Sequence, residues 1–229
     1  MVKRDRRIQW VAGSAVVLAL LFAGVATVAS ARDDGADHAA APAPRTPAVD
    51  SADAGFARDM AVHHQQAVEM SFIVRDRTQD EEVRRLAYDI ANTQANQRGM
   101  LLGWLDLWEL PKAAAGQEPM AWMAAGHEGH SMEGMGNGYR AHDGSLMPGM
   151  ATRTELDRLR GASGKKAEVL YLQLMTDHHK GGIDMARGCA RLCTVKVEKR
   201  LAQGMAEAQQ SELDTMARML AARGAKPRS

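Results

Sequence analysis

Paired histidines flanked by methionines occur twice in this chain of 229 residues. One segment starts at Met60, the other starts 115 positions later, and every matched residue keeps that offset. The candidate ligands of the two copies are Met60, His63, His64, Met70, Met175, His178, His179 and Met185. Imidazole nitrogen binds copper, zinc, iron and nickel, whereas thioether sulfur favours Cu(I). The two segments therefore predict a metal site, with copper as the first choice and zinc or another transition metal as the alternative.

The same offset continues downstream of the histidines, where Leu86 corresponds to Leu201 and Leu105 to Leu220. One sequence unit is therefore present twice. A single histidine on a helix is usually a core residue bonded to a neighbour, and methionine at helical spacing usually serves packing. Two copies with the same ligand types favour metal binding. A structural or interaction module with a buried polar layer and no metal stays open as the alternative.

Apolar residues around both motifs recur at spacings of three and four, which indicates amphipathic helices. Asp50 or Ser51 can cap the first helix and Asp80 the second, which Pro111 ends because proline cannot continue a helix. Two hairpins with one apolar stripe each must bury those stripes against each other, which predicts an all-α four-helix bundle. We place this bundle at 51–223, with hairpins at 51–110 and 164–223 and a loop with a short helix at 111–163.

Helical geometry predicts a polar layer across the two stripes, because residues advance by about 100° along a helix. On the antiparallel neighbours, Gln94 lies level with His63, and Gln209 lies level with His178. Buried polar groups cost free energy unless they are paired, so this layer needs a hydrogen-bond network or a ligand. We expect Gln94 and Gln209 to orient the imidazoles. The weaker candidates are Gln97, Glu212, Glu69 and Asp184.

Enzymatic chemistry has little support in the residues. A diiron centre in a helical bundle needs Glu-x-x-His pairs, and neither hairpin contains one. The sequence shows no general base, nucleophile or cofactor fingerprint, so we do not expect an enzyme. A metal-dependent redox enzyme, such as a copper oxidase, is the less favoured alternative.

The region between the hairpins combines methionine, histidine and glycine in a predicted loop, residues 112–151. His127 and His130 stand three apart, as do Met132 and Met135, and such short spacings suit metal capture. The alternative is a loop that folds over the bundle and buries some of its methionines, and both descriptions can hold together. Thr152 and Glu155 form a capping-box pattern that predicts a short helix over 156–160.

The N-terminal segment predicts export. Residues 8–31 carry no charge, follow a basic stretch and end in an Ala-x-Ala pattern that fits a cleavage site. The run is also long enough to span a bilayer, so residues 1–31 are either a cleaved signal peptide or a membrane anchor. Both place the rest outside the cytoplasm, whether secreted, periplasmic or at the cell surface. Proline-containing residues 32–50 read as a flexible linker, and a net charge of +1 gives no reason to expect nucleic acid.

Cys189 and Cys193 are the two cysteines of the chain, four positions apart near the turn of the second hairpin. Outside the cytoplasm such a pair favours a disulfide. A thiolate metal site is the alternative, although two cysteines are too few for a closed structural zinc site unless histidine joins them.

The paired segments 63–70 and 178–185, together with Met147-Pro-Gly-Met150, resemble the signatures of the family known as domain of unknown function 305. The resemblance covers about 51–223. It implies a ferritin-like helical bundle, export and, for some members, copper binding and copper tolerance. The second copy has Lys180 and Gly181 in place of Gln65 and Gln66, so these positions are poor ligand candidates. The sequence thus predicts an extracytoplasmic protein that sequesters copper or transfers it to a copper-handling partner protein.

Overall fold

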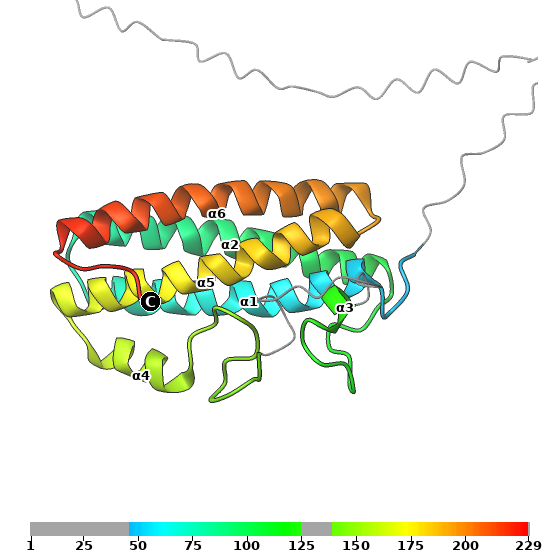
Figure 1. Ribbon diagram of the computed structural model, residues 1–229, viewed down its shortest axis with the longest axis horizontal. Helices are drawn as coiled ribbons and strands as arrows, with labels where there is room; N and C mark the ends of the chain where they lie inside the picture. The colour runs from blue at the N-terminus through cyan, green and yellow to red at the C-terminus, as the bar shows by residue number, and fades with distance from the viewer. Residues whose placement is uncertain (1–45, 125–138, 229) are drawn as a thin grey trace, which may run out of the picture. The chain divides into compact units, whose positions relative to one another are not determined.

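The computed structural model describes residues 46–124 and 139–228. This part of the chain is helical and contains no strand, which confirms the all-helical prediction for it (Figure 1). The helices are α1 Ala52–Arg75, α2 Glu81–Leu107, α3 Ala121–Ala124, α4 Arg153–Gly161, α5 Gly164–Leu192 and α6 Lys196–Ala222. The four long ones form two hairpins, α1 with α2 and α5 with α6.

Local capping fixes where the helices begin. The hydroxyl of Ser51 accepts a hydrogen bond from the amide of Ala54 at 3.2 Å and starts α1. The carboxylate of Asp80 does the same for α2. The predicted capping box between Thr152 and Glu155 is present, and α4 is longer than the five residues expected. Side-chain oxygens at these positions satisfy amide groups that the first helical turn leaves without partners.

α1 and α5 make the largest contact between the two hairpins. A first apolar cluster joins Met60, near the start of α1, to Met185, toward the end of α5. A second cluster joins Met70, toward the end of α1, to Met175, nearer the start of α5. The two helices therefore run antiparallel, and the four histidines lie between the clusters along both of them.

The segment between the hairpins packs on the first apolar cluster. This segment contains α3, which was not predicted. α3 buries Trp122 and Met123 against the cluster, and the Trp122 indole donates a hydrogen bond to Asp59 at 2.9 Å. Met120, Met147 and Met150 pack on the same cluster. Packing thus accounts for the methionines described in this segment, whereas the tract that contains His127 and His130 lies outside the described residues.

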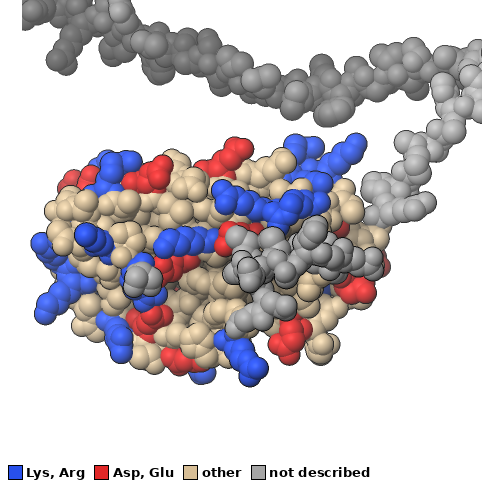
Figure 2. All heavy atoms as spheres, in the orientation of Figure 1, with Lys and Arg blue, Asp and Glu red and all other residues tan. Residues whose placement is uncertain are grey.

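None of the described helices is long and apolar enough to cross a membrane. The predicted signal peptide or anchor at 1–31, and most of the 32–50 linker, lie outside the described residues. On the face drawn in Figure 2, basic and acidic side chains are interspersed, in keeping with the small net charge of the chain.

Candidate metal centre

The four histidines of the repeated motif meet in the interior, each at most 1% exposed. His63 of α1 and His178 of α5 stack with ring centroids 3.8 Å apart and a tilt of 35° between the rings. The rings of His178 and His179 lie 6.3 Å apart. Packing of α1 on α5 therefore brings both copies of the motif to one layer.

Three of the imidazoles donate their Nε2–H group to an oxygen. His178 donates to the backbone carbonyl of His63 at 2.9 Å, His64 to Oε1 of Gln97 at 2.8 Å, and His179 to Oε2 of Glu212 at 2.6 Å. These oxygens can only accept, so the proton is on Nε2 and the lone pair of each ring is on Nδ1. All three Nδ1 atoms are buried without a partner. A metal-binding histidine is commonly fixed in this way, by a hydrogen bond from its other nitrogen.

The orienting groups differ from those predicted. Gln97 and Glu212 hold the imidazoles, whereas both polar atoms of the Gln94 side chain and Oε1 of Gln209 lack partners. The cause is angular, because His64 lies about 100° from His63 around α1 and so faces α2 one turn away from Gln94. The two hydrogen-bonded pairs each span 33 positions and occupy corresponding places in the two hairpins.

Burial keeps the rings of His63, His64 and His178 neutral at pH 7. It lowers the pKa of His63 to about 3 and that of His64 to about 4, and it lowers the pKa of His178 well below the ordinary value. The neighbouring histidines add to each lowering. The Pro148 carbonyl acts in the opposite direction on His63, although neither nitrogen of that ring has a partner at hydrogen-bonding geometry. Neutral imidazole is the form that binds metals, so at pH 7 these lone pairs are free for a cation.

A short segment, Met147–Ala151, crosses the layer, and we call it the strap. The Gln66 side chain clamps its end, donating to the Ala151 carbonyl at 2.8 Å and accepting from the Ala151 amide at 2.7 Å. The Pro148 carbonyl packs on α5 at Gly181, where a Cβ atom would lie only 2.1 Å from that oxygen. Gln66 and Gly181 are corresponding positions, so the repeat is broken where the strap crosses it. The difference between Gln66 and Gly181 is the sequence feature from which the strap could have been predicted, although it was not.

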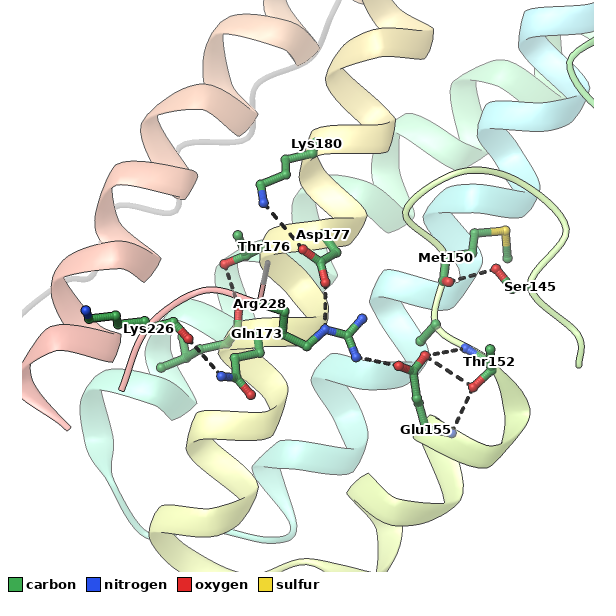
Figure 3. A network of polar contacts seen from close by, with 12 residues as sticks. Ser145, Met150, Thr152, Glu155, Gln173, Thr176, Asp177, Lys180, Lys226 and Arg228 are labelled. Carbon is green, nitrogen blue, oxygen red and sulfur yellow. Dashed lines mark hydrogen bonds and ion pairs between the residues drawn. The ribbon is translucent and has the colours of Figure 1, made fainter. Parts of the chain in front are cut away.

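A network of polar contacts lies next to the strap (Figure 3). Arg228, after α6, donates to Asp177 of α5 at 2.7 Å and also pairs with Glu155 of α4. The Ser145 hydroxyl donates to the Met150 carbonyl at 2.8 Å. Arg228 thus joins the C-terminal segment to α4 and α5 next to the strap, and Ser145 bonds the strap itself.

The other predicted residues are placed as follows. The motif methionines flank the histidine layer, Met60 and Met185 in the first apolar cluster and Met70 and Met175 in the second. Glu69 pairs with Arg160 of α4, so its carboxylate serves a partly exposed ion pair. Asp184 is half-buried, and burial raises its pKa against the effect of Arg187 and Arg191.

The donor set suits a soft cation. Among the described residues, ten buried side-chain polar atoms lack a partner, and eight of them belong to the four histidines, Gln94 and Gln209. Unpaired buried lone pairs cost free energy that a cation would recover. No three nitrogen or carboxylate ligand atoms of the layer lie within 4.8 Å of one another in the described structure. Imidazole nitrogen in the layer, with methionines in the clusters on either side, is a set of ligand types that suits Cu(I).

Comparison with known proteins places the chain in a family. A secreted DUF305 protein from Streptomyces coelicolor has 62% identity and a TM-score of 0.69, covering 80% of this chain and 99% of that one. A DUF305 fragment from Deinococcus radiodurans has 25% identity and a TM-score of 0.56, covering 76% of this chain and 95% of that one. CopM in a Cu(I)-bound form shares the fold at 18% identity and a TM-score of 0.53, covering 73% of this chain and 94% of that one. A Cu(II)-bound form of CopM also matches.

No curated protein matches the chain. The family model described as domain of unknown function (DUF305) matches residues 53–220, which is most of the described structure. The chain is a member of the DUF305 family.

Proposed function

We propose that this protein binds copper outside the cytoplasm and sequesters it or hands it over, through the histidine layer between α1 and α5. The observation that carries the proposal is the set of three buried Nδ1 lone pairs whose Nε2–H groups are already bonded. A structural polar layer would be expected to satisfy both nitrogens of its rings. Here Nε2 of each of the three rings is hydrogen-bonded, and Nδ1 is left without a partner.

Copper is favoured over other metals by the chemistry of the donors and by one relative. Nitrogen together with thioether sulfur is a soft ligand set, which favours Cu(I). CopM, which has the same fold, is described in Cu(I)-bound and Cu(II)-bound forms. The motif methionines on either side of the layer are the thioether candidates, and the ferritin-like arrangement of the bundle suits sites built between facing helices.

Two observations support a location outside the cytoplasm. The N-terminal sequence has the pattern of an export signal or anchor. The relative from Streptomyces coelicolor, at 62% identity, is described as secreted. In that compartment a copper-handling partner protein is the expected source or recipient of the metal.

The test is a titration of the purified chain with Cu(I) under a competing chelator. We expect His63→Ala combined with His178→Ala to weaken Cu(I) binding at least tenfold, and His142→Ala, at an exposed histidine, to leave it unchanged. Paired Met→Leu changes at Met60 with Met185, and at Met70 with Met175, then show which side of the layer supplies sulfur. Equal affinity in the double histidine variant and the native chain would remove the layer as the binding site.

A further inference from the structure

A second buried cluster lies at the turn between α5 and α6. Cys189 is in the last turn of α5, Cys193 caps that helix, and Glu198 is in the first turn of α6. A disulfide joins the two cysteines, whose Cα atoms are 4.8 Å apart. The sulfurs and a carboxylate oxygen of Glu198 all lie within 4.8 Å of one another, and the three residues are at most 2% exposed. Two potential thiolates and a carboxyl group therefore share one enclosed space.

Glu198 is buried beside the disulfide and next to the carboxyl group of Asp53. Neither of its carboxyl oxygens has a hydrogen-bond partner. Its neighbour Asp53 is engaged elsewhere, since it accepts from the amides of Thr194 and Val195 at 2.8 and 2.7 Å. Burial, and then the charge and the adjacent side chain of Asp53, raise the pKa of Glu198 to about 9, so the group is a neutral acid at pH 7. A buried acid beside another carboxyl group costs free energy, which a disulfide staple alone does not explain.

We propose that Cys189 and Cys193, once reduced, form a second Cu(I) site in which Glu198 donates a hydrogen bond to a thiolate. Thiolate sulfur is the softest ligand that proteins offer and selects Cu(I). Two sulfurs are too few to close a structural zinc site, which takes four ligands. The second site shares no residue with the histidine layer, so it does not rest on the function proposed above.

The chemistry balances with an external dithiol as reductant. The dithiol gives up two electrons and two protons and becomes a disulfide, while the bond between Cys189 and Cys193 breaks and each sulfur gains a proton. One Cu(I) then replaces the two thiol protons, which pass to solvent. The bis-thiolate complex carries one negative charge beside Asp53, and Glu198 keeps its proton because a further buried charge would be unfavourable. Its O–H group can then point at sulfur.

The experiment compares the full chain before and after reduction. The protein is reduced with a dithiol, freed of reductant without air, assayed for two thiols and titrated with Cu(I) under a competing chelator. We expect the reduced chain to bind one Cu(I) more than the oxidised chain, with a new ultraviolet thiolate-to-copper absorption. Cys189→Ser with Cys193→Ser should abolish both gains, whereas His63→Ala with His178→Ala should retain them. Failure of one site is thereby distinguished from failure of the other.

Variants at Glu198 test its role as donor. Glu198→Gln keeps an N–H donor and is expected to bind the additional Cu(I) within about threefold of the native affinity, while Glu198→Leu weakens it about tenfold or more. Glu207→Gln, at an exposed acid on the same helix, is the matched control. Two free thiols without additional Cu(I) would overturn the proposal. So would thiols that cannot be released in the folded chain, or helix lost on reduction that Cu(I) does not restore.

Discussion

At the scale of single residues, the histidine layer shows how a hydrogen bond on one ring nitrogen prepares the other. His64 and His179 occupy corresponding positions, yet the first donates to an amide and the second to a carboxylate. A carboxylate acceptor makes an imidazole a more basic ligand than an amide does. The two halves of the layer therefore hold chemically different nitrogens within one repeated geometry.

This difference leads to a reciprocal pair of substitutions. Glu212→Gln should weaken Cu(I) binding about tenfold, because it keeps an acceptor but removes its charge. Gln97→Glu should strengthen binding, because it supplies that charge to His64. Affinity is measured by chelator competition, and Glu207→Gln serves as the control for loss of a negative charge on α6. If both layer variants bind like the native chain, these bonds do not tune the site.

The buried histidines also predict how stability depends on pH. His64 has a folded pKa of about 4 and an ordinary value of 6.5, so between these values the unfolded chain takes up a proton that the folded chain refuses. The free energy of unfolding therefore falls as pH drops from 6.5 to 4, by about 3 kcal/mol for this group.

Glu198 acts in the opposite direction, because its folded pKa of about 9 is raised above the ordinary value of 4.5. The contribution of His64 is therefore taken from the difference between the native chain and His64→Gln in urea unfolding from pH 4 to 7. We expect this difference to shift in favour of the variant as pH falls. Parallel curves for the two proteins would mean that His64 is not held neutral in the native fold.

At the scale of elements, local signals were predictable and tertiary ones were not. The helix starts at Ser51 and Asp80 and the capping box at Thr152 follow from side chains that bond amides three positions away. α3 is four residues long and depends on the distant contact between Trp122 and Asp59, so no periodicity marks it. The layer was expected at the right level, but its orienting groups were misplaced by one turn, because helix rotation toward a neighbour is decided by packing.

Two glycine substitutions test the packing of the strap, and we expect opposite changes in the free energy of unfolding. Gly181→Ala should destabilise the fold by about 1–3 kcal/mol, because the added carbon would lie 2.1 Å from the Pro148 carbonyl. Gly204→Ala should stabilise it by up to about 1 kcal/mol, because α6 leaves that position open and alanine is the better helix former. Urea unfolding midpoints measure both. A Gly181 variant as stable as the native chain would show that the strap is not held against α5.

At the scale of the whole molecule, the histidine layer lies where the two hairpins meet. α1 and α5 make the largest contact between the hairpins, and the layer separates one apolar cluster from the other along both helices. An ion held by nitrogens from α1 and α5 would therefore link the hairpins between the two apolar clusters. Copper would stabilise the entire fold rather than one segment.

Thermal unfolding tests this linkage. A ligand that binds only the folded chain stabilises it by about 2.7 kcal/mol at one hundred times its Kd, which for a protein of this size raises Tm by about 5–10 °C. We expect Cu(I) to produce such a rise in the native chain and in His142→Ala, and none in the double variant His63→Ala with His178→Ala. Both sets of melts are run with the disulfide oxidised, so that Cys189 and Cys193 cannot take up metal. If saturating Cu(I) leaves the native Tm unchanged, the layer is a structural register between hairpins, because any ion bound to the native state alone must shift the equilibrium toward it.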